Sequence, residues 1–361
     1  MDLAFLRPMY ERTGPWTSVY LDASRDTHDA AKVIDLRWSA LRDHLAGACD
    51  RDVEAIAAAV LADRDPGRHG LALFANGGEV VVREELPTPP THDQASHSLL
   101  PYAMPLAVAH GEEVPWIRVV VDRTGASITE VTGGATARTS TVEGGETFGL
   151  TKSKPGGWSA PRYQRAAEEA WDRNAGDVAK AVTQLVKRTG AEIVILAGDV
   201  RARGACKENL PAAILDRVVE TDAGSRASTD THALDQAAEV AIAEHIAARH
   251  VAITDRFRQD SGRNAVTGLD DVVRALAEAK VDTLLLENDP SSNDHVWIGE
   301  APSQIAVSEE ESRAQGVESP ERVRADSAIL RTLAMTDASL LTVESGDVAM
   351  SDGIGALLRY R

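Results

Sequence analysis

The sequence predicts an α/β chain built from three domains. Three observations support this fold class: strand-like and helix-like apolar patterns alternate, glycine-containing turns join β-rich runs, and one apolar run is typical of a strand buried on both faces. The 361 residues, 43% of them hydrophobic, suffice for two or three compact domains. We expect the domains to span residues 1–112, 113–260 and 261–361.

The first domain is predicted to begin with a strand and two helices. The strand-like run is Trp16 to Ser24. The first helical stretch, Asp29 to Cys49, carries an apolar stripe, and the second, Asp50 to Ala62, ends before Asp65-Pro66-Gly67. The stripe consists of Val33, Leu36, Leu41 and Leu45.

A β-hairpin follows these helices. Residues 70–75 and 79–84 flank Asn76-Gly77-Gly78, a strong hairpin signal. The Pro-rich segment that starts at Leu86 reads as an extended connector. After it we expect Leu99 to Ala109 to form another strand.

The second domain opens with a hairpin, a long helix and a buried strand. The runs Trp116 to Asp122 and Ala126 to Val131 surround a short turn. A helix is predicted from Ala160 to about Arg188, and the apolar run Glu192 to Ala197 indicates a strand covered on both faces. Two more helical stretches follow, Lys207 to Val219 and Thr231 to about Arg258.

The third domain follows a small, polar linker, Asp260 to Thr267. A helix, Leu269 to Ala279, and a strand, Val281 to Glu287, open it. The acidic run Glu309 to Glu311 is expected to be a solvated segment. The remaining expected elements are Val296 to Ile298, a helix from Arg322 to Met335, and a strand from Ser339 to Val343.

Composition limits the possible functions. A formal net charge of -18 argues against nucleic-acid binding over the whole surface. Two cysteines, Cys49 and Cys206, argue against a disulfide framework or a cysteine-rich zinc site, and the ten histidines are scattered. With neither a signal peptide nor a membrane span expected, we predict a cytoplasmic protein without a metal site, cofactor or small-molecule substrate.

The stretch from Thr151 to Arg173 departs from this acidic background. Residues 151–165 contain four cations and no acid. Pro155-Gly156-Gly157 suits a loop tip that approaches a partner closely, Trp158 offers a ring for stacking, and Ser159 can cap the following helix. The four cations are Lys152, Lys154, Arg162 and Arg165.

This stretch has an ordinary interpretation as well as a functional one. A glycine pair is often only a turn, and the arginines could pair with Glu168, Glu169 and Asp172. The acidic background favours the functional interpretation, because a locally positive loop in a negative protein is suited to contact with phosphates.

The loop resembles a motif of the archaeal and eukaryotic class I release factors. That family carries Gly-Gly-Gln-Ser, two residues, then Arg-Phe and one further Arg. Here the run is Gly156-Gly157-Trp158-Ser159-Ala160-Pro161-Arg162-Tyr163-Gln164-Arg165. Trp158 stands where the family has the glutamine that positions water for cleavage of peptidyl-tRNA.

The resemblance implies a ribonuclease-H-like middle domain and a ribosomal-protein-like, RNA-binding C-terminal domain. It also implies a bacterial, Balon-type ribosome hibernation factor that occupies the vacant A site of the 70S ribosome, with elongation factor Tu as a companion. Because the glutamine is missing, no catalytic residue and no enzyme activity are expected. The rRNA-binding loop would comprise Lys152, Lys154, Gly156, Gly157, Trp158, Ser159, Arg162 and Arg165.

Three alternatives remain open. A peptidyl-tRNA hydrolase would need Gln164, or a water held by the loop backbone, in place of the usual glutamine. A metal-dependent nuclease would use Asp122 and Asp199, which end predicted strands, although a third and fourth ligand are lacking. A stress-response protein would bind RNA or partner proteins away from the ribosome.

Overall fold

The chain folds as two compact units. The terminal unit consists of Met1–Glu112 and Ile253–Arg361, and the middle unit of Glu113–Ala252. The predicted division into three domains stays a prediction. The computed structural model describes the backbone of 160–169 and, in full, residues 1–45, 47–112, 114–131, 138–143, 170–226, 231–287 and 294–360.

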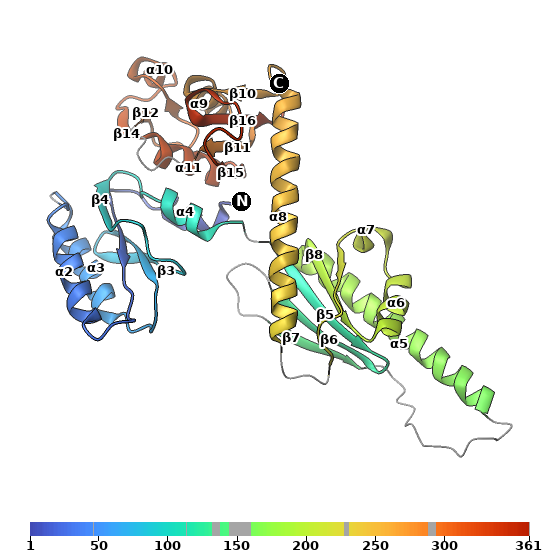
Figure 1. Ribbon diagram of the computed structural model, residues 1–361. Helices are drawn as coiled ribbons and strands as arrows, with labels where there is room; N and C mark the ends of the chain where they lie inside the picture. Colours follow the sequence, from blue (N-terminus) through green and yellow to red (C-terminus); the bar gives the residue numbers. More distant parts are fainter. Residues whose placement is uncertain are drawn as a thin grey trace. The chain divides into compact units, whose positions relative to one another are not determined.

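An antiparallel sheet and two helices form the N-terminal half of the terminal unit (Figure 1). Its elements are β1 (Trp16–Asp22), α2 (Ala30–Arg42), α3 (Asp50–Ala62), β2 (Gly70–Asn76), β3 (Glu79–Leu86) and β4 (Gln94–Ser98). The strand order is β3-β2-β1-β4. Val19 and Leu21 pack with the helices, whereas Tyr20 between them belongs to a core on the opposite face. Successive side chains of β1 therefore point to opposite faces of the sheet, and both faces are buried.

The apolar stripe of α2 differs from the predicted one. Val33 and Leu36 are 41% and 62% exposed, whereas Ile34 and Trp38 are buried. The prediction was right for Leu41 and Leu45, but the helix turns the i, i+4 positions Ala30, Ile34 and Trp38 toward the core.

The expected strand at Leu99 to Ala109 was wrong, because this segment contains helix α4 (Met104–His110). Pro105 lies in its first turn, a position that proline tolerates. The Leu106 amide donates to the Tyr20 hydroxyl at 3.1 Å, and that hydroxyl donates to the Tyr102 carbonyl oxygen at 2.8 Å. Tertiary packing decides the conformation of this short apolar run, which periodicity leaves ambiguous.

Two small sheets and three helices form the C-terminal half of the terminal unit. Its elements are β10 (Ala265–Thr267), α9 (Leu269–Ala277), β11 (Val281–Glu287), β12 (His295–Ile298), β13 (Ile305–Ala306), α10 (Glu309–Ala314), β14 (Glu321–Arg324), α11 (Ala325–Met335), β15 (Ser339–Val343), η2 (Ser351–Gly353) and β16 (Ile354–Leu358). One sheet has the order β10-β16-β11-β15 and the other β13-β12-β14.

Two expectations for this half need correction, whereas the acidic run keeps its expected exposure at Glu310 and Glu311. The acidic run is the first turn of α10, where the Ser308 hydroxyl accepts from the Glu311 amide at 3.2 Å. Acidic residues suit that position because the helix N-terminus carries partial positive charge. The expected linker contains β10, and the start of the expected helix at Arg322 is strand β14, which pairs with β12.

The two halves of the terminal unit share an apolar core. A 3-10 turn, η1 (Ala4–Leu6), and a short helix, α1 (Arg7–Tyr10), contribute Leu3, Leu6 and Met9 to the same cluster as Leu330 and Leu333 of α11. The Arg7 guanidinium also donates to the Ala334 carbonyl oxygen at 2.8 Å. Residues from the two ends of the sequence therefore stabilise one fold.

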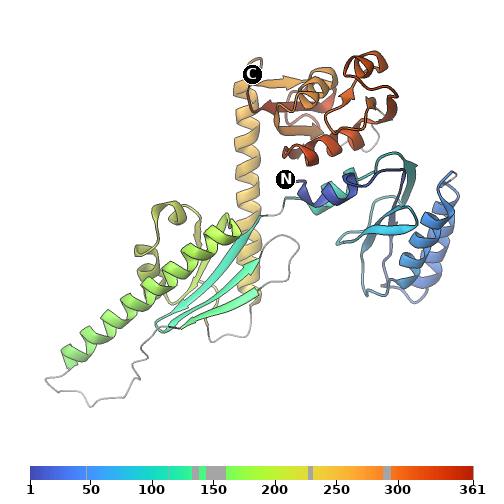
Figure 2. The ribbon, with the colours of Figure 1, turned by 180° about the vertical axis from the view of Figure 1, so that it is seen from behind.

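The middle unit is a five-stranded sheet with helices on both faces (Figures 1 and 2). Its elements are β5 (Trp116–Asp122), β6 (Gly125–Val131), β7 (Arg138–Glu143), α5 (Ala160–Thr189), β8 (Ile193–Gly198), α6 (Val200–Glu208), α7 (Ala212–Leu215), β9 (Val218–Glu220) and α8 (His232–Asp260), which continues past the unit boundary. The strand order is β7-β6-β5-β8-β9, with β5, β8 and β9 parallel and β6 antiparallel to its neighbours.

The order of hairpin, long helix and doubly buried strand was predicted correctly. Val194 and Leu196 of β8 pack in the core under α5, and Ile193 and Ile195 pack on the face covered by α8. Strands β7 and β9 were missed. The expected helix at Lys207 to Val219 is interrupted, because α6 ends at Glu208, Pro211 is the N-cap of α7, and the last expected residues belong to β9.

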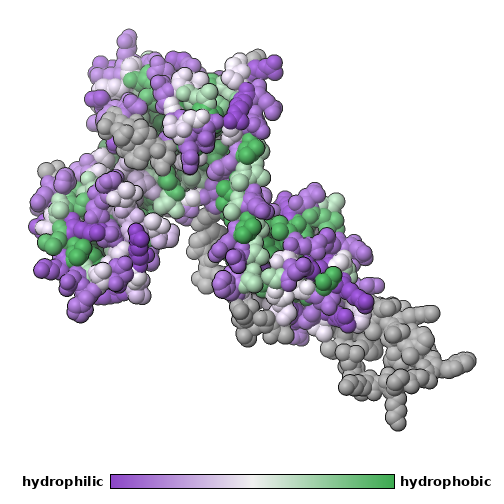
Figure 3. Space-filling view, in the orientation of Figure 1, coloured by the Kyte–Doolittle hydropathy of each residue, from purple (hydrophilic) through white to green (hydrophobic). Residues whose placement is uncertain are grey.

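Apolar residues also occur on the surface. Val240 and Val251 of α8 are exposed, and Figure 3 shows apolar residues gathered along this helix. Across the described residues, the helices lack the combination of length and hydropathy that crossing a membrane requires.

The shared core of the terminal unit leads to a stability prediction. Leu330→Ala removes a fully buried side chain and is expected to lower the free energy of unfolding by about 2–5 kcal/mol. Leu36→Ala, at an exposed site on α2, is expected to change it by less than about 0.5 kcal/mol. Chemical denaturation of both variants measures the difference, and equal effects would contradict the difference in burial between the two side chains.

Candidate functional site

The predicted loop lies largely outside the described residues. This holds for Lys152, Lys154, Gly156, Gly157, Trp158 and Ser159. Arg162 and Arg165 lie in the first turns of α5, where the backbone is described. The structure therefore defines the support of the loop.

Helix α5 is a long rod fixed to the sheet at its C-terminal part. Its 30 residues correspond to a length of about 45 Å. Val178, Val182 and Val186 are buried against the sheet with residues such as Ile117 and Val119. Figure 2 shows the N-terminal part of the helix extending past the edge of the sheet. The rod thus carries its first turns away from the core.

The turn between β5 and β6 is held by Asp122. One oxygen of this carboxylate accepts from the Thr124 amide at 2.7 Å, the Gly125 amide at 3.0 Å and the Arg226 guanidinium at 2.9 Å. Burial alone would raise the pKa of Asp122, but the hydrogen bonds from Thr124 and Arg226 outweigh it and the pKa is lowered. Asp122 is therefore charged at neutral pH.

The same turn is tied to α5. The Asn174 side-chain amide donates to the Arg123 carbonyl oxygen at 3.1 Å, and the Arg123 guanidinium lies 4.7 Å from the centre of the Trp171 ring. Such a cation–π contact fixes the indole and leaves the arginine at the surface. We call Asp122, Arg123, Trp171, Asn174 and Arg226 the α5 root. It connects α5 to the sheet.

Asp199 also has a structural role. Its carboxylate caps α6 by accepting from the Arg201 and Ala202 amides at 3.0 and 3.1 Å, and it lies 3.8 Å from the Arg123 guanidinium. Gly198 before it has φ +105°, and a Cβ there would come within 2.0 Å of the Val121 carbonyl oxygen.

The geometry gives no support to the nuclease alternative. Asp122 and Asp199 are engaged by turn and cap hydrogen bonds, and Glu239 and Glu244 are exposed on α8. Among the residues that the structure describes, no group of three or more His, Cys, Asp or Glu side chains is arranged to hold a metal ion.

A small cavity of about 120 Å³ lies beside the α5 root. Val178, Ala202 and Cys206 line it together with Trp171. Burial raises the pKa of the Cys206 thiol to about 11, so the thiol is protonated at neutral pH and serves as an apolar wall.

The histidine of α8 that faces the sheet is paired. His245 Nε2 lies 2.9 Å from a Glu192 oxygen, and the Arg249 guanidinium lies 3.3 Å from the same oxygen. This arrangement connects α8 to the start of β8. It agrees with the expectation of surface or satisfied histidines for His245.

Charge is distributed unevenly between the units. In residues 113–252 lysines and arginines nearly equal aspartates and glutamates, so most of the net charge of -18 belongs to the rest of the chain. The loop cations are thus carried by the nearly balanced unit. Contact with a polyanion there meets less repulsion than elsewhere on this protein.

Sequence reasoning missed most of the α5 root. Trp171 lay inside the predicted helix without an assigned role, and no role was predicted for Arg123 or Arg226. A usable signal existed, because Asp122-Arg123-Thr124-Gly125 is a turn sequence whose aspartate binds the following amides. Nothing in the sequence shows that Arg226, more than a hundred residues away, would join it.

The comparisons with known proteins define the class. A family model described as bacterial archaeo-eukaryotic release factor family 2 matches residues 115–263, which include every strand of the middle unit and α8. Rv2629 of Mycobacterium tuberculosis strain H37Rv and MT2704 of strain CDC 1551, both described as uncharacterized proteins, are each 32% identical over 370 residues. The alignment covers 98% of this chain and 96% of each relative. The chain belongs to bacterial archaeo-eukaryotic release factor family 2.

Solved structures match over most of the chain but superpose loosely. The crystal structure of an archaeal translation termination factor, aRF1, is 17% identical, with 99% of this chain and 97% of that chain covered and a TM-score of 0.28. A model of ribosome-bound archaeal Pelota and ABCE1 is 16% identical, with 100% and 94% covered and a TM-score of 0.43. Superpositions this loose carry no information about function.

The lowered pKa of Asp122 predicts a pH-dependent effect of Asp122→Asn. The side chain is 37% exposed, so solvent weakens the pair with Arg226, and we expect a loss of about 1 kcal/mol at pH 7. Because the folded pKa is depressed, this contribution is present above the ordinary pKa and is lost as the pH falls. The difference from the wild type should therefore shrink below about pH 4.

Thermal or urea unfolding from pH 7 to pH 3 measures this difference. Asp177→Asn is the matched control, because Asp177 makes an exposed i, i+3 pair with Lys180 on α5. A loss for Asp122→Asn that is constant with pH would show that charge is not its cause.

Proposed function

We propose that this protein is a ribosome hibernation factor. It occupies the vacant A site of idle 70S ribosomes and brings the basic loop near the peptidyl-transferase centre without hydrolysing peptidyl-tRNA. The observation that carries this proposal is the run Gly156-Gly157-Trp158-Ser159 before α5 in a member of a release-factor family. The glycine pair and the cations of the motif are present, and the glutamine is replaced by tryptophan.

The support of the loop is suited to this role. Arg162 and Arg165 follow the loop in the first turns of α5, and the N-terminus of that helix adds partial positive charge. The α5 root and the apolar face of α5 hold the rod against the sheet. RNA phosphates are bound through such arginine and lysine charges, and these phosphate contacts fix the orientation of the protein on the RNA.

Trp158 changes the chemistry of the tip. An indole has one N–H donor and no acceptor, so it cannot hold a water molecule as a carboxamide does. Its ring can stack on an exposed base. With tryptophan in place of glutamine, the protein would occupy the A site without cleaving peptidyl-tRNA. Elongation factor Tu is proposed as a companion, and the cytoplasm as the compartment.

Removing the loop charge tests the binding. Lys152→Ala, Lys154→Ala, Arg162→Ala and Arg165→Ala together should weaken co-sedimentation with vacant 70S ribosomes roughly tenfold or more and reduce its salt dependence, because fewer counterions are released. The control removes four exposed cations elsewhere: Lys32, Arg68, Lys180 and Lys187. Equal losses in both variants, or a wild-type protein absent from the ribosomal fraction at low salt, would refute the proposal.

A peptide-release assay separates hibernation from hydrolysis. The wild type should release no peptide from a stalled ribosome complex above background, since Trp158 cannot position water. Turnover that survives Trp158→Ala and disappears with Gln164→Ala would establish the hydrolase instead. Trp158→Gln restores the family residue at the tip, so release by this variant alone would show that the loop reaches the active centre.

A further inference from the structure

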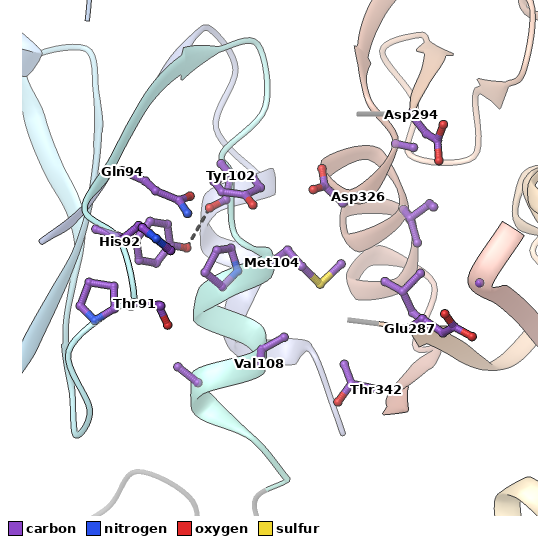
Figure 4. A pocket seen from close by; sticks show the side chains of 18 of the residues that line it. Thr91, His92, Gln94, Tyr102, Met104, Val108, Glu287, Asp294, Asp326 and Thr342 are labelled. Carbon is purple, nitrogen blue, oxygen red and sulfur yellow. Dashed lines mark hydrogen bonds between the residues drawn. The ribbon is translucent and has the colours of Figure 1, made fainter. Parts of the chain in front are cut away.

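A cavity of about 590 Å³ lies inside the terminal unit, where its two halves face each other. Tyr102, Met104 and Val108 line it from α4 and the preceding turn, and Leu286 and Ile329 line it from β11 and α11. Figure 4 shows Met104 pointing from α4 toward α11. The volume is in the range of ligand sites, which is roughly 300–1,000 Å³.

Carboxylates dominate the charged groups in the lining of this cavity, which also contains the imidazole of His92 and neutral polar groups such as Gln94. Glu287, Asp294, Asp326 and Asp352 border it, and the described residues that line it include no lysine or arginine. Asp326 is paired with Arg324 at 2.6 Å, and Asp352 accepts from the Leu269 amide at 3.1 Å. The Glu287 carboxylate reaches the Gly346 amide only at 3.5 Å, so it keeps acceptor capacity for a ligand.

This lining selects for one kind of ligand. A phosphate or nucleotide would meet like charge from the carboxylates and is disfavoured. A cation on an aliphatic stem fits both the acidic and the apolar portions of the lining. Its charge can pair with Glu287 while its methylene groups contact Met104 and Val108. Arginine and lysine side chains have this form.

The surroundings favour a protein over a small polyamine. The terminal unit holds most of the acidic excess of the chain, so its field attracts a basic partner. A thin polyamine would leave the apolar walls from Met104 to Ile329 in contact with water, whereas an extended segment with alternating basic and aliphatic side chains would cover them. We propose that this cavity binds a basic, extended segment of a partner protein through an inserted arginine or lysine side chain.

Fluorescence anisotropy of the full-length protein tests this proposal. The probe is a fluorescein-labelled peptide of alternating leucine and arginine, compared with a peptide that has glutamate in place of arginine. Saturable binding of the arginine peptide alone is expected. Glu287→Gln removes the charge and Met104→Trp fills the cavity at constant charge, and each should weaken binding at least fivefold. Glu310→Gln, an exposed acid on α10, should leave it within twofold.

Thr91→Lys provides a variant that leaves the core intact, because Thr91 is exposed at the rim of the cavity. It should weaken binding like Glu287→Gln. Wild-type affinity in both Glu287→Gln and Thr91→Lys, an equal loss in Glu310→Gln, or displacement of the peptide by spermidine at equal affinity would overturn the proposal. None of these variants touches the basic loop, so ribosome binding is tested independently.

Discussion

The geometry of the proposed ribosome-binding element depends on one packing interface, the apolar face of α5 against the five-stranded sheet. Val178, Val182 and Val186 fix the C-terminal part of the helix, and Asn174 ties it to the β5–β6 turn. A rigid helix transmits this anchorage along its length, since each turn is bonded to the next. The direction of α5 is thus set by residues far from its N-terminus.

Elements with strong and long patterns could be predicted from the sequence. Helix α5 was identified from its start and stop signals and its charged face, and the doubly buried strand β8 from a continuous apolar run. Short elements were not predicted, because their patterns are weak or ambiguous. Strands β7 and β9 are too short and polar to stand out, and α4 owes its conformation to packing around Tyr20. On α2 the predicted stripe included Val33 and Leu36, and only packing on the sheet shows that Ile34 and Trp38 are buried in their place.

The residues of the basic loop could be predicted from the sequence, but the α5 root that holds the helix behind it could not. The charge reversal and the glycine pair are properties of consecutive residues, so one sequence displays them. The α5 root joins residues from β5, α5 and the segment before α8, and its contacts arise only on folding. Asp122 and Asp199 illustrate the limit. A strand-end aspartate looks the same whether it binds a metal ion, closes a turn or caps a helix.

The shared core of Leu3, Leu6 and Met9 with α11 has a consequence for biosynthesis. During translation these first residues leave the ribosome long before Leu330 and Leu333 are made. The middle unit has all its partners earlier and can fold first, because domains fold as units from the N-terminal side. The nascent N-terminal half must wait with one apolar face uncovered, which makes it a natural client for chaperones until the last strands emerge.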